Sequence, residues 1–287
     1  MTVTGIKTSK TSKNMAPRVA VVTGSNKGIG FAIVRALCKE FNGDVYLTAR
    51  DENRGQDAVK QLNNEGLSPK FHQLDIDDNS SIERLRDFLQ DTYGGLDVLV
   101  NNAGIAFKVD STAPFPEQAE VTIKTNFWST LNVCDKLFPI LKPHARVCNV
   151  SSMGSQMSIA KCSPELKAKF KDPKLTMDGL KKLMEEFVSL AKENKHEAAG
   201  WPNTAYGVSK IGVTVMSFIQ QKELEGREDI IVNACCPGYV ATDMSSFKGH
   251  KTIDQGAETP VMLALIPPGA ASPRGKFLSE KTVQNWG

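Results

Sequence analysis

The stretch Thr23-Gly24-Ser25-Asn26-Lys27-Gly28-Ile29-Gly30 separates two segments with different hydrophobic patterns. Before it, the run from Arg18 to Thr23 is apolar and rich in β-branched residues, which is typical of a buried parallel strand. After it, apolar residues at helical spacing predict a helix over 29–41. A strand, a glycine-rich turn and a helix in this order form the phosphate-binding unit of doubly wound α/β folds.

Each glycine of this stretch has a physical role in such a unit. Gly24 permits a tight turn, Gly28 lets the backbone approach a phosphate, and Gly30 lets the helix pack closely on the strand. The N–H groups at the start of the helix, near Asn26 and Ile29, would then bind a pyrophosphate. The alternative interpretation, a glycine-rich turn without a ligand, fits the flanking strand and helix less well.

The charges around the loop distinguish between the two nicotinamide cofactors. A site that prefers NAD has an acidic residue about 20 positions after the loop, whereas this chain has Ala49 and then Arg50. Arg50 and Lys27 together suit a 2′-phosphate and predict NADPH/NADP+, although both could be ordinary surface cations. Asp51 would weaken this preference if its side chain turned inward.

The alternation of strands and helices continues along the chain and predicts one Rossmann-type domain with a doubly wound parallel sheet. Helix 80–93 has Ser80 and Ser81 as candidate N-caps. Further strands are expected at 44–49, 70–74, 96–100, 146–150, 230–234 and 276–279, and helices at 53–63, 80–93, 118–138 and 205–223.

Two segments depart from this alternation. Residues 1–16 are polar and read as a flexible N-terminal extension, with Met15 a candidate native start, so the domain is assigned to 17–287. Residues 161–201 contain no strand pattern and form a helical insertion. Within it, an apolar stripe over 176–195 predicts a surface helix docked on the domain, with a partner-binding helix as the minority interpretation.

The composition narrows the classes of function. The chain has 287 residues, 40% of them hydrophobic, a mean hydropathy of −0.26 and a net charge of +3, which gives no reason to expect a nucleic acid or a membrane as partner. The four histidines show no metal-ligand spacing, so no metal is expected. The six cysteines form no C-x-x-C motif or disulfide framework, which predicts a reducing, cytoplasmic location.

Tyr206 and Lys210 are four residues apart and would share one face of a helix. A nearby cation favours the phenolate, so we expect Lys210 to lower the pKa of Tyr206 and allow it to exchange a proton with a substrate oxygen. Polar or glycine-rich segments follow three other predicted strands, at the sheet edge where such folds bind ligands. These segments are 101–104, 149–152 and 236–238.

Together with the glycine loop, these segments make the chain resemble the short-chain dehydrogenase/reductase family. Within it the chain closely resembles the monomeric NADPH carbonyl reductases of vertebrates, including the fish 20β-hydroxysteroid dehydrogenase forms. Further shared motifs lie at 71–78, 101–108, 124–127 and 234–238. The resemblance implies a catalytic set of Asn126, Ser152, Tyr206 and Lys210, with Ser152 preferred over Ser151. It also implies cofactor contacts from Asp75, Ile76, Asn102, Pro237, Gly238, Val240 and Thr242, besides Tyr206 and Lys210 themselves.

The resemblance also implies a class of substrate and an oligomeric state. It implies a monomer acting on small carbonyl compounds: quinones, aldehydes, keto steroids or prostaglandins. Met153-Gly154 and Tyr239 depart from the mammalian pattern, which affects substrate ranking rather than reaction class. Cys236 is expected near the pocket, where it would be either a reactive thiol or, more usually, a buried inert one, with Cys235 facing the other way. Candidate pocket residues are Ser152, Phe107, Lys108, Gln118, Tyr239 and Met244.

Two other functions remain open at this point. One is a narrower 20β-hydroxysteroid or prostaglandin dehydrogenase that uses the same residues. The other is an NADPH-binding sensor without catalysis, which the intact Tyr–Lys–Ser–Asn set disfavours.

Overall fold

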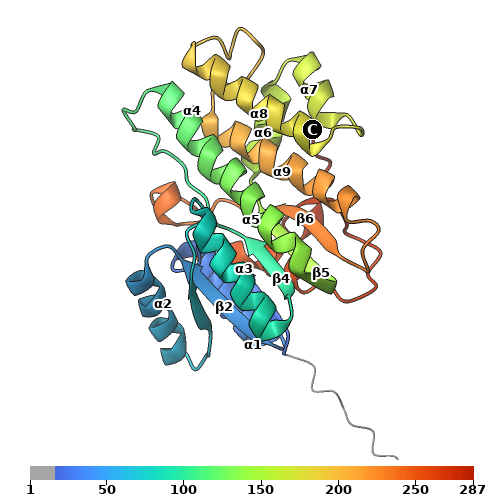
Figure 1. Ribbon diagram of the computed structural model, residues 1–287. Helices are drawn as coiled ribbons and strands as arrows, with labels where there is room; N and C mark the ends of the chain where they lie inside the picture. The colour runs from blue at the N-terminus through green and yellow to red at the C-terminus, as the bar shows by residue number, and fades with distance from the viewer. Residues whose placement is uncertain (1–16) are drawn as a thin grey trace, which may run out of the picture.

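The computed structural model describes residues 17–287, so the predicted extension at 1–16 and Met15 lie outside the described part of the chain. Its centre is an eight-stranded sheet in the order β3-β2-β1-β4-β5-β6-β7-β8 (Figure 1). All neighbours from β3 to β7 are parallel, and β8 is antiparallel to β7. The strands are β1 (Val19–Val22), β2 (Asp44–Ala49), β3 (Lys70–Gln73), β4 (Leu96–Asn101), β5 (Leu141–Val150), β6 (Ile231–Cys236), β7 (Phe277–Ser279) and β8 (Thr282–Val283).

Helices cover both faces of this sheet, which confirms the predicted α/β class. Helices α1, α2 and α10 pack on one face, and α3, α5 and α9 pack on the other. The α-helices are α1 (Gly28–Glu40), α2 (Glu52–Asn64), α3 (Asn79–Tyr93), α4 (Phe115–Ile123), α5 (Thr130–Leu137), α6 (Met153–Lys161), α7 (Pro164–Lys171), α8 (Met177–Lys192), α9 (Ala205–Glu223) and α10 (Ile253–Ala264).

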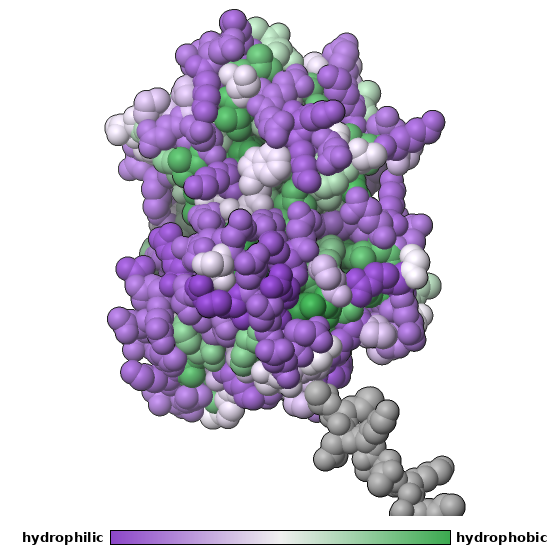
Figure 2. Space-filling model, viewed as in Figure 1, coloured by the Kyte–Doolittle hydropathy of each residue, from purple (hydrophilic) through white to green (hydrophobic). Residues whose placement is uncertain are grey.

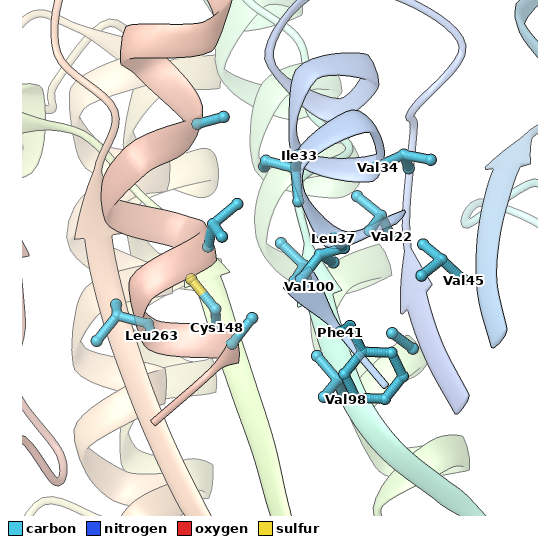
Figure 3. Close-up of a cluster of buried hydrophobic side chains, with 14 of the residues drawn as sticks. Val22, Ile33, Val34, Leu37, Phe41, Val45, Val98, Val100, Cys148 and Leu263 are labelled. Carbon is cyan, nitrogen blue, oxygen red and sulfur yellow. The ribbon is translucent and has the colours of Figure 1, made fainter. Parts of the chain in front are cut away.

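The core follows from the alternation of side chains along the strands. Figure 3 shows Ile33 and Leu37 of α1 beside Val22 and Val100 of the central strands. All four side chains are fully buried. Val19 and Val21 point to the opposite face, where they join a second cluster with α3. Because β1 is buried on both sides, it needs an unbroken apolar run, as the sequence predicts.

Several details differ from the sequence-based expectations. Asp78, rather than Ser80 or Ser81, is the N-cap of α3, because its carboxylate accepts the Ser80 N–H. The helix predicted at 118–138 begins at Phe115 and changes at Lys124–Ser129 into a π-helical turn. Helices α6, α7 and α10 were not predicted.

The helical insertion packs on the domain. Leu180, Met184 and Phe187 of α8 are fully buried in a cluster shared with α4 and α9. This confirms the interpretation of the apolar stripe as a docked surface helix. Hydrophilic residues cover most of the face in Figure 2, with only small separate hydrophobic patches. Among the described residues, no helix is both long and apolar enough to cross a membrane.

Candidate active site

The glycine-rich loop leaves the carboxyl end of β1 and opens α1. Gly24 and Gly28 have φ values of +59° and +60°, in the left-handed region that favours glycine. A Cβ at Gly30 would lie 2.5 Å from Asn102 Nδ2, so a side chain cannot fit there. The N-cap residue Lys27 forms no side-chain cap, so in the described structure the first N–H groups of α1 remain available to an anion.

Thr23 and Asn102 hold the loop in this shape. Asn102 Nδ2 donates to the carbonyl oxygens of Thr23, at 3.0 Å, and Gly24, at 2.9 Å. In return, Thr23 Oγ1 accepts the backbone N–H groups of Asn102 and Ala103. Asn102 therefore supports the glycine turn from the end of β4. The role of Thr23 was not predicted, because nothing in its sequence position indicates a partner 79 residues away.

The two predicted phosphate-binding cations have different surroundings. Arg50 is exposed at the end of β2, and no hydrogen bond or ion pair with residues 17–287 engages its guanidinium group. Lys27 Nζ instead pairs with Asp243 at 2.5 Å. The Asp51 carboxylate accepts the Arg54 N–H at 2.9 Å as the N-cap of α2, so it is turned toward its own helix. These residues fit a dinucleotide that carries a 2′-phosphate.

A bridge of side chains joins the ends of β2 and β3. Gln73 Nε2 donates to the carbonyl oxygen of Arg50, and Gln73 Oε1 accepts the Ser81 hydroxyl. Ser81 Oγ also accepts the N–H of Asp75 at 3.0 Å. The predicted adenine contacts, Asp75 and the buried Ile76, are thereby fixed relative to Arg50.

Tyr206 and Lys210 lie in the first turns of α9, which Thr204 caps by accepting the Gly207 N–H. Lys210 is buried, and its Nζ donates to the carbonyl oxygen of Val150 at 2.9 Å and lies 5.7 Å from the centroid of the Tyr206 ring. The structure therefore places the amine beside both the tyrosine and the end of β5.

Ser152 and Ser151, which follow β5, have different surroundings. Ser152 is the N-cap of α6, and its hydroxyl lies near the Tyr206 ring, since a Cβ on Gly154 would be 3.2 Å from Ser152 Oγ and 3.6 Å from Tyr206 Cε1. Ser151 is buried, and its hydroxyl donates to the carbonyl oxygen of Lys210 and pairs with Thr214. These contacts favour the predicted choice of Ser152 as the serine that faces a substrate.

Asn126 lies inside the π-helical turn and is almost fully buried. Its side chain exchanges two hydrogen bonds with the backbone of Ile105 and donates a third to Ser209 Oγ. A Cβ placed at Gly104 would lie 3.1 Å from Asn126 Oδ1 and 3.7 Å from Lys210 Nζ. Asn126 and Lys210 thus meet at Gly104, and a π turn at a functional position is a recurrent finding.

The pKa values of the pair differ from the expectation. Burial raises the pKa of Tyr206 to about 12, although the hydrogen bond with Ser152 lowers it in part. Burial also lowers the pKa of Lys210 to about 8. The expected lowering of the Tyr206 pKa does not occur in this structure: the net shift is upward, and desolvation of the phenolate is its largest cause. Tyr206 is therefore a phenol at neutral pH.

The segment after β6 lies next to the glycine loop. It begins with Pro237 and Gly238, and Val240 is buried further along. The Thr242 methyl group lies 3.4 Å from the position that a Cβ on Gly28 would occupy. The structure thus brings the predicted nicotinamide contacts next to the predicted pyrophosphate loop.

The predicted substrate residues other than Ser152 lie on the loop after β4, on α4 and on the segment after β6. Lys108 Nζ donates to the Asp243 carbonyl oxygen and to Ser246 Oγ, on the segment where Tyr239 and Met244 are exposed. Phe107 is half-buried, and Gln118 Nε2 donates to the carbonyl oxygen of Ala113.

The cysteines of β6 face opposite sides, as predicted. Cys236 packs with Met153 and Phe277, whereas Cys235 Sγ lies 3.5 Å from Cys148 Sγ in the other core. Burial raises the pKa of Cys236, so it is a protonated thiol at neutral pH. This favours the interpretation of Cys236 as a buried, inert thiol.

In the part of the chain that the structure describes, no three metal-ligating side chains come together.

A doubly wound sheet with a glycine-rich turn and a Tyr–Lys pair at one edge is the arrangement of a nucleotide-dependent oxidoreductase. A family model described as short chain dehydrogenase matches residues 18–177, and the chain belongs to this family. It is 60% identical to carbonyl reductase [NADPH] 1 of Rattus norvegicus, over 93% of this chain and 98% of the relative. Its identity to carbonyl reductase [NADPH] 1 of Homo sapiens is 58%, with the same coverage.

A solved structure supports the same assignment. Salutaridine reductase from Papaver somniferum superposes with a TM-score of 0.82 at 32% sequence identity, and the match covers 91% of this chain and 99% of that one. Since both comparisons span nearly the whole chain, the fold of the family extends well beyond residue 177.

Proposed function

We propose that this protein is an NADPH-dependent carbonyl reductase that transfers a hydride to ketones, aldehydes and quinones. The observation that carries the proposal is the convergence of Tyr206, Lys210, Ser152 and Asn126 at the sheet edge that also holds the glycine loop. The similarity to the NADPH carbonyl reductases of Rattus norvegicus and Homo sapiens supports the cofactor and the reaction class. Such a set can deliver a proton to an oxygen as negative charge develops on it.

The bound NADPH supplies the hydride. Ser152 Oγ would donate a hydrogen bond to the substrate carbonyl oxygen and orient it toward Tyr206. Tyr206 Oη would then give its proton to that oxygen as an alcohol forms. Reduction requires the protonated phenol, so the raised pKa of Tyr206 keeps the acid form present at neutral pH.

Lys210 and Asn126 would restore the proton on Tyr206. Lys210 Nζ donates a hydrogen bond to the carbonyl oxygen of Val150, which positions the ammonium group beside the Tyr206 ring. Asn126 is held by Ile105 and Ser209, and it reaches toward Lys210 at Gly104. A water between Asn126 and Lys210 would complete a relay, and Lys210 would also bind the ribose of the cofactor.

The direct test is oxidation of NADPH, with NADH in parallel, in the presence of menadione, an aromatic aldehyde and a 20-keto steroid. Rapid reduction of several unrelated carbonyls with NADPH would support the proposal. Turnover of the steroid alone would favour the narrower hydroxysteroid dehydrogenase. Tight binding of NADPH without any turnover would contradict the proposal and favour a sensor.

Arg50→Ala is expected to raise the Kd for NADPH by about 10-fold to 100-fold, because a charge-assisted hydrogen bond to the 2′-phosphate is lost. NADH lacks that phosphate, so its Kd should change by less than about twofold. Titration of the cofactor fluorescence measures both values. Arg84→Ala, which removes an exposed arginine on α3, is the matched control. Equal weakening of both cofactors would contradict the assignment of Arg50.

The rate of reduction is expected to fall as the pH rises through about 8, the value to which burial lowers the pKa of Lys210. Below this pKa the amine is protonated and can serve the relay, whereas above it the charge is lost. A profile of kcat/KM between pH 6 and 10 measures the effect, and Lys210→Arg should move the alkaline limb upward. A Lys210→Arg profile with an unshifted limb would assign the titration to another group.

The remaining proposals concern assembly and location. We propose a monomer, because α8 covers buried surface of α4 and α9 within the same chain. Light scattering of the purified protein tests this directly. We also propose a cytoplasmic location, supported by six cysteines that are free thiols.

A further inference from the structure

The carboxylate of Asp243 lies beside Lys27, the glycine-loop cation that is predicted to bind the 2′-phosphate. Asp243 Oδ2 pairs with Lys27 Nζ at 2.5 Å, across 216 residues of sequence. The preceding residue, Thr242, packs its methyl group near Gly28. One cation predicted to bind the 2′-phosphate therefore already has an internal anion as its partner.

Contacts of the backbone hold Asp243 in this position. Thr242 and Ser245 form a reciprocal capping box around the short turn Asp243–Ser245. Lys108 Nζ donates to the carbonyl oxygen of Asp243 and to Ser246 Oγ, which ties the turn to the loop after β4. The capping box joins Thr242 and Ser245, and Lys108 contacts the Asp243 backbone, so the Asp243 side chain can be changed without removing these contacts.

The charges determine whether Asp243 strengthens or weakens the binding of a 2′-phosphate at Lys27. The hydrogen bond and the charge of Lys27 lower the pKa of Asp243, which is therefore an anion at neutral pH. A 2′-phosphate at Lys27 must either displace Asp243 or lie next to it as a second anion, and both cost free energy. NADH brings no phosphate to this position and avoids that cost.

We propose that Asp243 determines cofactor affinity by competing with the 2′-phosphate for Lys27. The inference rests on the proposed binding of NADPH at this loop. The competition weakens both NADPH and NADP+, and so it favours release of the oxidised cofactor after turnover. Arg50, which has no such competitor among the described residues, then supplies most of the preference for the phosphate.

The test compares the Kd values of NADPH, NADP+ and NADH for Asp243→Asn and the unmodified protein. Asparagine keeps the shape and removes the charge. Both side chains are about half exposed or more, so we expect NADPH and NADP+ to bind about threefold to tenfold more tightly. The Kd for NADH should change by less than about twofold. In a Lys27→Ala background, most of the gain from Asp243→Asn should disappear.

Asp57→Asn is the matched control, because Asp57 forms an exposed pair with Lys60 on α2. It should leave all three Kd values unchanged. Weaker or unchanged NADPH binding in Asp243→Asn, an equal gain for NADH, or a full gain without Lys27 would each overturn the inference. An unmodified protein that binds NADPH no more tightly than NADH would contradict the proposed function instead, so the two failures are distinguishable.

Discussion

Replacing Tyr206 by phenylalanine is expected to lower kcat for carbonyl reduction by about 1,000-fold or more while NADPH still binds. The substitution removes one oxygen, and with it the proposed source of the proton. The aromatic ring stays in place beside Lys210, so the packing at the start of α9 should be kept. Single-turnover measurements with menadione, together with the Kd for NADPH, separate the chemical step from cofactor binding.

Tyr93→Phe is the matched control for this experiment. The Tyr93 hydroxyl donates to Asp44 Oδ2 at 2.6 Å, away from the glycine loop and α9. Its removal should leave the kinetic constants unchanged. A Tyr206→Phe protein that turns over menadione at the original rate would show that the proton comes from another group, and the proposed mechanism would then be wrong.

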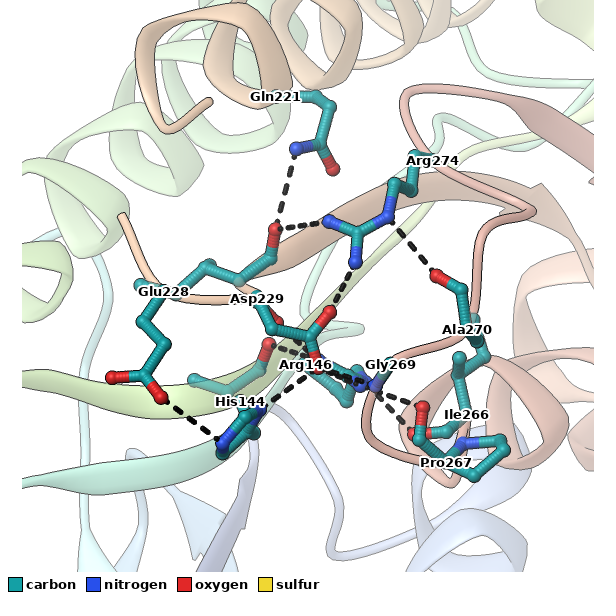
Figure 4. Close-up of polar contacts among 12 residues, drawn as sticks. His144, Arg146, Gln221, Glu228, Asp229, Ile266, Pro267, Gly269, Ala270 and Arg274 are labelled. Carbon is teal, nitrogen blue, oxygen red and sulfur yellow. Dashed lines mark hydrogen bonds and ion pairs between the residues drawn. The ribbon is translucent and has the colours of Figure 1, made fainter. Parts of the chain in front are cut away.

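The second large effect is expected at Arg146, which is fully buried in β5. Its guanidinium group donates to the carbonyl oxygens of Ile266 and Pro267, both at 2.8 Å, and to Asp229 (Figure 4). Arg274 also pairs with Asp229 (Figure 4). Burial tends to raise the pKa of Asp229, but hydrogen bonds from the Gly269 N–H, His144 and Arg146 outweigh it and hold the pKa well below its ordinary value.

Arg146→Met should lower the free energy of unfolding by about 3–5 kcal/mol, because the buried carbonyl oxygens of Ile266 and Pro267 lose their donor and the charged Asp229 loses one of its donors. Denaturant unfolding measures the change. Arg84→Met, at an exposed pair on α3, should cost less than about 0.5 kcal/mol. If Arg146→Met unfolds at the same denaturant concentration as the unmodified protein, this cluster does not stabilise the fold.

The sequence predicted the parts of the fold that depend on local pattern. The strand before the glycine loop is an unbroken apolar run, and both this strand and the long helix after Thr204 appear nearly where expected. Helix α10 was missed because Pro260 lies inside it and weakens the helical pattern. The π turn at Lys124–Ser129 was also missed, since an extra residue in a helix leaves the apolar spacing almost unchanged.

The sequence predicted the site residues that directly follow strands. It did not predict contacts between residues that are far apart in the sequence. Lys27 was expected to bind the 2′-phosphate, and only the three-dimensional structure shows its pairing with Asp243. The pKa of Tyr206 was predicted with the wrong sign, because sequence spacing reveals a neighbouring charge but not the extent of burial. Ser151 and Ser152 could be told apart from the sequence only by resemblance, whereas the structure shows Ser151 hydrogen-bonded to Lys210 and Thr214 and Ser152 lying near Tyr206.

The position of the Arg146 cluster on β5 has a consequence for protein engineering. Arg146 precedes Ser152 by six residues, which corresponds to about 20 Å along an extended chain. Substitutions at such a separation combine additively in most proteins. Thermostability could therefore be improved around the Arg146 cluster first, and a library that varies the predicted pocket residues Tyr239 and Met244 could then be selected for new substrates in the stabilised protein.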